Sequence, residues 1–143
     1  MKLNEKPQDL IFIESTGFSM WPFLKAGERL VVKKAGEGDL KIGDIILYHS
    51  NNQMVCHRLV KKVVCEDGYL FYARGDNSLS SGELVTEDIL IGKVIGSFKN
   101  GRFISLSGGW RHFTNRLIVQ FGPFLGWASR LLKDRFMRRR FRS

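Results

Sequence analysis

The fold is decided by one stretch of sequence, QMVCHRLVKKVVCEDGYLFYAR (residues 53–74). Its first part, residues 53–64, is the longest β-like run of the chain. Strict alternation would place on one face Val55, His57, Leu59, Lys61 and Val63. Asp67-Gly68 is a strong hairpin signal, and the run YLFYAR (69–74) follows it as a second strand. The stretch therefore predicts a long antiparallel hairpin.

Five further runs have the composition of short strands, and turn residues separate them. They are residues 10–14, 28–34, 45–50, 88–100 and 102–106. Asn51-Asn52 and Asn100-Gly101 are typical of the tight turns that join antiparallel strands. The chain shows no strand–helix–strand alternation. We therefore expect a mainly β domain of six or seven short strands, a sandwich or a small barrel, over residues 1–109.

The composition fits one globular domain and indicates no cofactor. The chain has 143 residues and 43% hydrophobic content, which excludes global disorder. Cys56 and Cys65 lack the spacing of metal ligands, so we expect no metal and no cofactor, and both a reduced pair and a single bridge fit.

The first ten residues lack the apolar core of a secretory signal. No run of 18 apolar residues predicts a membrane-spanning helix.

Residues 110–143 differ in character from the rest of the chain. Nine Lys and Arg residues against one acidic residue supply eight of the nine net positive charges. Large apolar residues recur there at roughly helical spacing, interrupted by Gly122-Pro123. We predict a basic amphipathic helical tail, joined at residues 107–109, that lies on a membrane surface. Packing on the β-domain or on a partner protein is the alternative, and no nucleic-acid partner is expected.

The segment Thr16-Gly17-Phe18-Ser19-Met20-Trp21-Pro22 places a serine in a glycine-containing turn. Such a turn can aim a hydroxyl and backbone N–H groups at one point, where the N–H groups would stabilise an oxyanion. A serine hydroxyl is a poor nucleophile until a neighbouring base takes its proton. Taken alone, the segment is more typical of an ordinary surface turn.

Ser19 opens a series of five short segments whose order carries more information. The other four are Lys41–Tyr48 (KIGDIILY), His57–Val60 (HRLV), Gly75–Asn77 (GDN) and Ile91–Val94 (IGKV). In this order the segments resemble the type I signal peptidases and the related LexA-type self-cleaving proteins, over roughly residues 10–96. In these families SMxP carries the nucleophile, GDI opens a core strand and the next long strand carries the base. GDN and GKV complete the β-fold.

The resemblance implies that His57 is the general base for Ser19, as in the Ser-His branch of these families. An imidazole titrates near neutral pH and accepts the serine proton without the strong desolvation that a lysine needs. Lys61 is the rival base, on the predicted face of His57 but about 13 Å further along the strand. Lys62 is expected on the opposite face. The alternative interpretation of His57 is a structural histidine.

Asp76 in the GDN segment matches the acid that supports the histidine in this branch. An Asx turn at a strand end is the alternative interpretation. The branch usually has a second aspartate about six residues later, and here Gly82 and Glu83 occupy that region. Glu83 is therefore a possible substitute for the missing acid.

The rest of the predicted site surrounds the nucleophile. Gly17 stands two residues before Ser19, as in the LexA-type arrangement, so the oxyanion hole would depend on backbone N–H groups with Thr16 as an extra donor. Met20 and Pro22 complete the SMxP motif, and we expect them to contact the substrate.

Together these features predict a serine endopeptidase that cleaves a signal or leader peptide from a precursor protein through an acyl-enzyme. We expect small residues beside the cut and a peripheral location on a membrane, or a cytoplasmic one if the tail does not bind membrane. Typical members anchor through an N-terminal helix, and here the tail or a partner would supply that contact. A non-catalytic peptide-binding module on the same fold is the alternative. A self-cleaving repressor is disfavoured because the base is not lysine.

Overall fold

The computed structural model describes residues 10–106, and residues 53–74 form the hairpin that their sequence predicts. Strand β4 (Gln53–Cys65) pairs antiparallel with β5 (Gly68–Arg74). Because Cys65 faces Gly68 across the ladder, the turn itself is Glu66-Asp67, one residue earlier than expected. Gly68 has a φ of 126°, a conformation that only glycine adopts readily.

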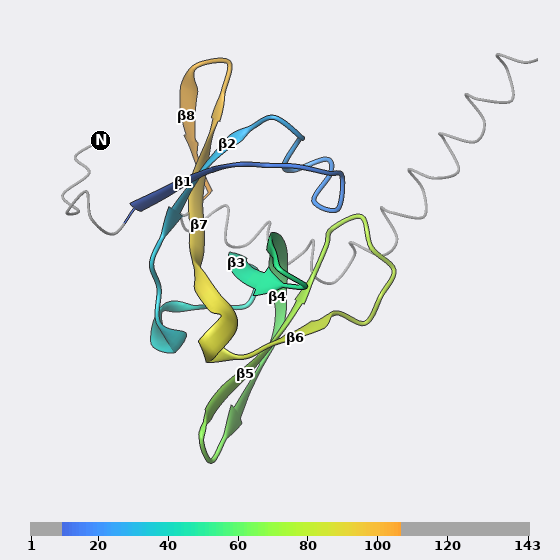
Figure 1. The fold of residues 1–143 in the computed structure, drawn as a ribbon, viewed down its shortest axis with the longest axis vertical. Coiled ribbons are helices and arrows are strands. Elements are labelled where there is room, and N and C mark those ends of the chain that lie inside the picture. The colour runs from blue at the N-terminus through green and yellow to red at the C-terminus, as the bar shows by residue number, and fades with distance from the viewer. Residues whose placement is uncertain (1–9, 107–143) are drawn as a thin grey trace, which may run out of the picture.

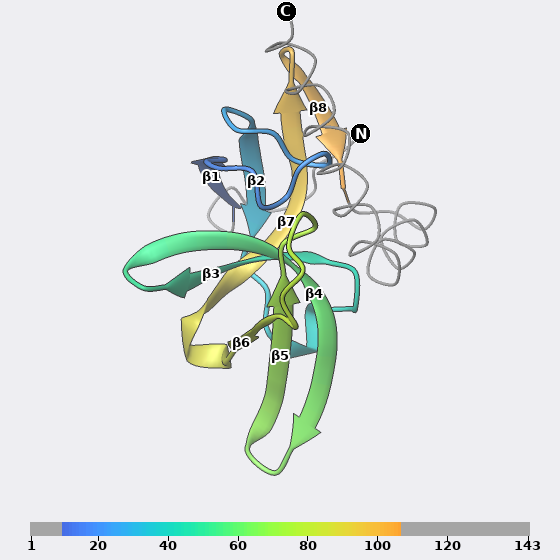
Figure 2. The same ribbon diagram turned by 90° about the vertical axis from the view of Figure 1, so that its right-hand side faces the viewer.

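Within the described residues, eight strands form one curled antiparallel sheet (Figures 1 and 2). Its hydrogen-bonded path is β1-β2-β7-β3-β4-β5-β6, and β8 pairs with β7 beside this path. The other elements are β1 (Leu10–Glu14), β2 (Arg29–Lys33), η2 (Glu37–Asp39), β3 (Ile45–Ser50), β6 (Glu83–Val85), η3 (Glu87–Ile89), β7 (Leu90–Lys99) and β8 (Arg102–Ser105).

The mainly β fold class is confirmed, and seven of the eight strands match predicted runs. The prediction missed β6, because three residues in a polar stretch are too few to show alternation. The predicted helical tail and the boundary at residues 107–109 lie outside the described residues.

A β-bulge in β4 overturns one prediction about its faces. The pairing with β5 shifts register between Leu59 and Lys61, so one extra residue is inserted and the alternation changes phase. Lys62 consequently lies opposite Phe71, in the core cluster to which Leu59 belongs, and its ammonium is 5.7 Å from the centroid of that ring. The prediction that Lys61 shares the face of His57 was therefore wrong.

Strand β3 is buried on both faces and divides the core in two. Ile45 and Leu47 belong to a first cluster, with residues from β2 and β7, whereas Ile46 and Tyr48 belong to a second, with residues from β4, β5 and β6. Successive side chains of a strand point to opposite faces, so four consecutive buried residues require cover on both sides. The curl of the sheet supplies that cover.

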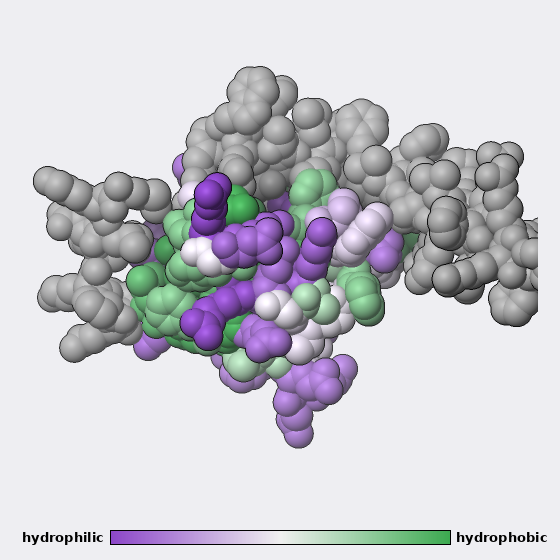
Figure 3. Space-filling view, turned by 90° about the horizontal axis from the view of Figure 1, so that it is seen from above, coloured by the Kyte–Doolittle hydropathy of each residue, from purple (hydrophilic) through white to green (hydrophobic). Residues whose placement is uncertain are grey.

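Two hairpins extend from opposite ends of the molecule, β4–β5 at one end and β7–β8 at the other (Figures 1 and 2). Seen from the β7–β8 end, polar residues occupy the middle of the surface and apolar residues lie on either side of them (Figure 3). Across residues 10–106, no helix has the length and apolar character needed to cross a membrane.

Gly92 on β7 generates a test of this packing. A Cβ at Gly92 would overlap the carbonyl oxygen of Lys33 on the neighbouring segment. Gly92→Ala is therefore expected to lower the free energy of unfolding by about 1–3 kcal/mol, as overpacking does. Gly38→Ala is the matched control, because Gly38 is exposed and its Cβ would meet nothing within 4 Å. Urea denaturation of both variants measures the difference, and equal stabilities would contradict the packing.

Candidate active site

Ser19 lies in the turn after β1, and its neighbours fix the turn to the core. The N–H of Leu24 donates to the carbonyl of Met20 at 3.0 Å, which closes a single helical turn after Ser19. Met20 and Leu24 are 4% and 1% exposed and belong to the first core cluster. Gly17 has a φ of 83°. Ser19 itself is exposed, so a solvent-accessible hydroxyl is attached to a firmly packed turn.

The GDN loop packs directly on Ser19. The N–H of Asn77 donates to the carbonyl of Ser19 at 2.8 Å. A Cβ at Gly75 would lie 2.8 Å from that carbonyl oxygen and 3.0 Å from the Cβ of Ser19. Glycine is therefore the residue that allows this approach, which explains in physical terms why the segment begins with Gly75.

The structure pairs Asp76 with Arg58 instead of with the histidine. Nε and Nη2 of Arg58 donate to the two carboxylate oxygens of Asp76 at 2.7 and 2.6 Å, and Nη1 donates to the carbonyl of Gly43 at 2.9 Å. The side chains of Arg58 and Asp76 are 1% and 5% exposed. Bidentate pairs of this kind are among the stronger hydrogen-bonded contacts in proteins. Among residues 10–106 Asp76 makes no hydrogen bond to His57, and its charge raises the pKa of that ring.

A second buried acid joins two more of the sequence segments. Asp44 is 4% exposed, accepts a bond from the N–H of Lys41 at 2.8 Å and forms an ion pair with Lys93 at 2.8 Å. The GDI and GKV segments thus meet, and the carbonyl of Gly43 links them to Arg58. The segments that were noted only for their order in the sequence are in contact in space.

His57 is half-buried on β4, and one of its ring nitrogens is hydrogen-bonded to a tyrosine hydroxyl. Nδ1 of His57 lies 2.8 Å from the hydroxyl of Tyr48. That hydroxyl donates to Oε2 of Glu83 at 2.8 Å, and the hydroxyl of Ser50 donates to Oε1. Glu83, which the sequence offered as a substitute acid, thus reaches His57 through Tyr48. Tyr48 and Ser50 were not predicted, because both stand in an ordinary strand pattern.

Burial and neighbouring charges set the protonation of this cluster. Desolvation lowers the pKa of His57, and the carboxylates of Glu83 and Asp76 oppose that effect. The hydrogen bond from Ser50 is the main cause that lowers the pKa of Glu83, so the carboxylate is ionised at neutral pH. Burial raises the pKa of Tyr48, followed by the hydrogen bond to Glu83, so the phenol keeps its proton.

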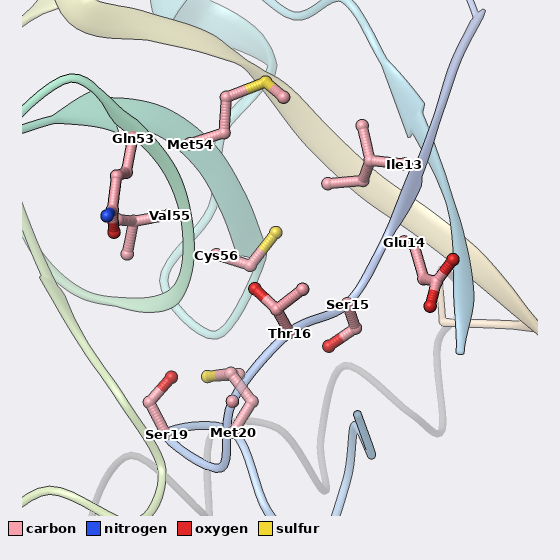
Figure 4. A pocket seen from close by; sticks show the side chains of 11 residues that line it. Ile13, Glu14, Ser15, Thr16, Ser19, Met20, Gln53, Met54, Val55 and Cys56 are labelled. Carbon is pink, nitrogen blue, oxygen red and sulfur yellow. The ribbon is translucent and has the colours of Figure 1, made fainter. Parts of the chain in front are cut away.

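A pocket of about 160 Å³ opens beside Ser19. It is lined by the end of β1, the following turn and the start of β4 (Figure 4): Ile13, Glu14, Ser15, Thr16, Gly17, Ser19, Met20, Gln53, Met54, Val55 and Cys56. Of the predicted site residues, Thr16, Gly17, Ser19 and Met20 therefore share one pocket, whereas Pro22, His57 and Asp76 do not line it. His57 follows the lining residue Cys56 directly in β4.

Two further features bear on reactivity at the pocket. Cys56 and Cys65 are both free, which excludes a bridge between them, and burial raises the pKa of the Cys56 thiol to about 12. Among residues 10–106, the N–H of Ser19 donates to no other group, and its hydroxyl makes no hydrogen bond to His57. Catalytic hydrogen bonds are often long in substrate-free enzymes and tighten when substrate binds.

Comparison with models of known protein families and with curated proteins finds no match to this chain. The resemblance to the signal peptidases therefore depends on the motifs alone. In the described part of the chain, no group of three or more His, Cys, Asp or Glu side chains is arranged to hold a metal ion.

The pairing of Asp76 with Arg58 predicts a large cost for removing the acid. Asp76→Ala leaves a buried guanidinium without its counter-ion, and such losses typically cost about 3–5 kcal/mol of stability. The control is Asp88→Ala, which removes an exposed carboxylate and is expected to change little. Chemical denaturation measures both variants. A cost for Asp76→Ala no larger than for Asp88→Ala would contradict a structural role for this pair.

Proposed function

We propose that the protein is a serine endopeptidase of the signal peptidase type, with Ser19 as nucleophile and His57 as general base. The observation that carries the proposal is the contact of the GDN loop with Ser19, because the same loop carries an acid whose charge raises the pKa of His57. Gly75 and Asn77 of this loop contact Ser19, and the charge of Asp76 acts on His57. If Ser19 were an ordinary turn residue and His57 an unrelated structural residue, we would not expect one loop to act on both.

In the proposed reaction the hydroxyl of Ser19 attacks the scissile carbonyl while His57 takes the hydroxyl proton. His57 then gives this proton to the leaving amine, which leaves an acyl-enzyme. Water activated by His57 hydrolyses the ester and regenerates Ser19. The free N–H of Ser19 is the proposed donor to the oxyanion, because it has no acceptor among residues 10–106.

Two strand edges beside the pocket support an extended peptide as substrate. Within residues 10–106, β1 is an end strand of the sheet and pairs with β2 alone. The first residues of β4 pair with β3, whereas β5 begins its pairing only at Arg58, so among the described strands Gln53–His57 present a second unpaired edge. Unpaired edges bind extended peptides through main-chain hydrogen bonds. The proposed substrate is a signal or leader peptide of a precursor protein, with small residues at the cut.

The proposed site of action is a membrane surface. The support is the basic composition of residues 110–143, in which eight net positive charges stand beside large apolar residues. Such segments bind anionic headgroups. A precursor that is held at the same surface would then meet the pocket.

The decisive experiment is cleavage of a secretory precursor on membranes by the full chain. Ser19→Ala and His57→Ala are each expected to lower the rate by at least about 10³-fold, because either change removes the proton transfer from the serine. Ser81→Ala and His49→Ala are matched controls on exposed residues. Equal turnover by the wild type, Ser19→Ala and His57→Ala would reject the catalytic function.

A non-catalytic peptide-binding module is the second candidate, and one observation favours it. No hydrogen bond joins Ser19 to His57 within residues 10–106. The strand edges beside the pocket offer main-chain groups to a peptide, and this binding needs neither side chain. This candidate predicts that an extended peptide binds the wild type and Ser19→Ala with equal affinity and that neither cleaves it. Isothermal titration of the precursor peptide together with the cleavage assay separates the two functions.

The partial burial of His57 predicts the acid limb of the activity profile. The groups that face His57 are Tyr48 of β3, Glu83 of β6 and Asp76 of the loop after β5. Desolvation is the largest influence and favours the neutral ring, so the pKa of the base lies below the ordinary value of about 6.5. Neutral His57 therefore persists below about pH 6.5, and the pH at which kcat/KM reaches half of its plateau should lie below that value.

Removing one carboxylate should extend this behaviour. In Glu83→Gln, desolvation is opposed by one charge fewer, so the pKa of His57 should fall and the acid limb should move to still lower pH. The measurement is kcat/KM against pH for both proteins with one peptide. An acid limb above about pH 6.5 in the wild type, or a shift to higher pH in Glu83→Gln, would contradict this assignment.

A further inference from the structure

Tyr48 connects the proposed base to an acid that does not touch it. The ring of Tyr48 is completely buried, and its hydroxyl lies 2.8 Å from Nδ1 of His57 and 2.8 Å from Oε2 of Glu83. The two rings are tilted by 60° with their centroids 6.0 Å apart, so the contact is made by the hydroxyl and not by stacking. The three residues belong to three strands, β3, β4 and β6.

Counting protons determines the direction of each bond in this cluster. A phenol has one proton, and the hydroxyl of Tyr48 donates it to the carboxylate of Glu83. The same oxygen can then only accept from the ring of His57. The contact with Nδ1 therefore requires an N–H on Nδ1, and the neutral ring has its lone pair on Nε2.

Ser50 keeps this arrangement from reversing. Its hydroxyl donates to the second oxygen of Glu83, which stabilises the ionised carboxylate. A protonated Glu83 would be able to donate to Tyr48, and Tyr48 would then donate to Nδ1 and move the ring proton to Nε2. The Asp76 carboxylate does not take this role in the structure: its two oxygens accept from Arg58, and among residues 10–106 no hydrogen bond joins it to His57.

We propose that Tyr48 is a positioning residue that holds the neutral His57 ring in the Nδ1–H form. Its hydroxyl donates its only proton to Glu83 and therefore accepts a hydrogen bond from Nδ1–H of His57. The consequence for catalysis rests on the proposed peptidase function, in which Nε2 is the atom that takes the proton of Ser19. The tautomer does not depend on that function. Tyr48 and Glu83 replace the direct carboxylate of an ordinary triad with a relay of two hydrogen bonds.

The direct test is proton–nitrogen NMR of the full chain labelled on its histidine rings, at a pH at which His57 is neutral. The His57 signals are identified by their loss in His57→Ala. The expected result for the wild type is a protonated Nδ1 and an unprotonated Nε2. In Tyr48→Phe the Nδ1–H population should fall, since a free imidazole prefers the proton on Nε2. Tyr72→Phe, which removes a hydroxyl from β5, should leave the His57 signals unchanged.

Glu83→Gln tests the same relay without altering the core ring. Its amide can donate to Tyr48, which frees the phenol proton to point at Nδ1, so the Nδ1–H population should again fall. Tyr48→Phe is also expected to lower kcat/KM by at least about tenfold while KM changes little, because it acts on the base and not on the peptide site. A wild-type ring protonated on Nε2 would overturn the inference. So would an unchanged tautomer in both folded variants.

These outcomes separate the inference from the function on which it rests. A protein that cleaves no precursor but loses the Nδ1–H form in Tyr48→Phe supports the relay and rejects the peptidase. Cleavage that requires Ser19 and His57, together with a His57 tautomer that is unchanged in Tyr48→Phe and Glu83→Gln, supports the peptidase and rejects the relay.

Discussion

The guanidinium of Arg58 is buried where three separate parts of the chain meet. It binds both oxygens of Asp76 in the GDN loop and the carbonyl of Gly43 before β3, and its centre lies 5.6 Å from the ring centroid of Phe23 after Ser19. A buried cation is costly unless its hydrogen bonds are satisfied, so these partners have little freedom to move apart. The position of Ser19 depends on this constraint, because the loop that packs on Ser19 is held by Arg58.

The same constraint explains why Asp76 and Glu83 act on His57 in different ways. Asp76 is committed to Arg58 through both oxygens, and it reaches His57 by charge alone. The acid that is hydrogen-bonded toward the ring comes from another element, because β6 brings Glu83 to the hydroxyl of Tyr48. Tyr48 can hold that place because β3 is covered on both faces, which leaves its hydroxyl no competing contact with bulk water.

The sequence predicted elements well and their contacts less well. Seven strands were visible because each carries enough alternation or a tight turn such as Asn100-Gly101, whereas β6 is too short for either signal. The bulge after Leu59 was not visible, since one inserted residue leaves composition unchanged, and it reversed the faces of Lys61 and Lys62. Within the proposed site, Ser19 and His57 were predicted from motif order. The roles of Asp76 and Glu83 depend on side-chain contacts between strands distant in sequence, which no local pattern encodes.

The two halves of the proposed site are attached to different cores. Met20 fixes the turn of Ser19 to the first cluster, while Tyr48 ties His57 to the second. The position of Ser19 relative to His57 therefore depends on the curl of the sheet, and no single element sets it. An extended peptide bound to the free edges of β1 and β4 would touch both halves at once. In the proposed reaction, binding energy from the main chain of the peptide draws the serine and the histidine into line, so that only a substrate long enough to span both edges is cut.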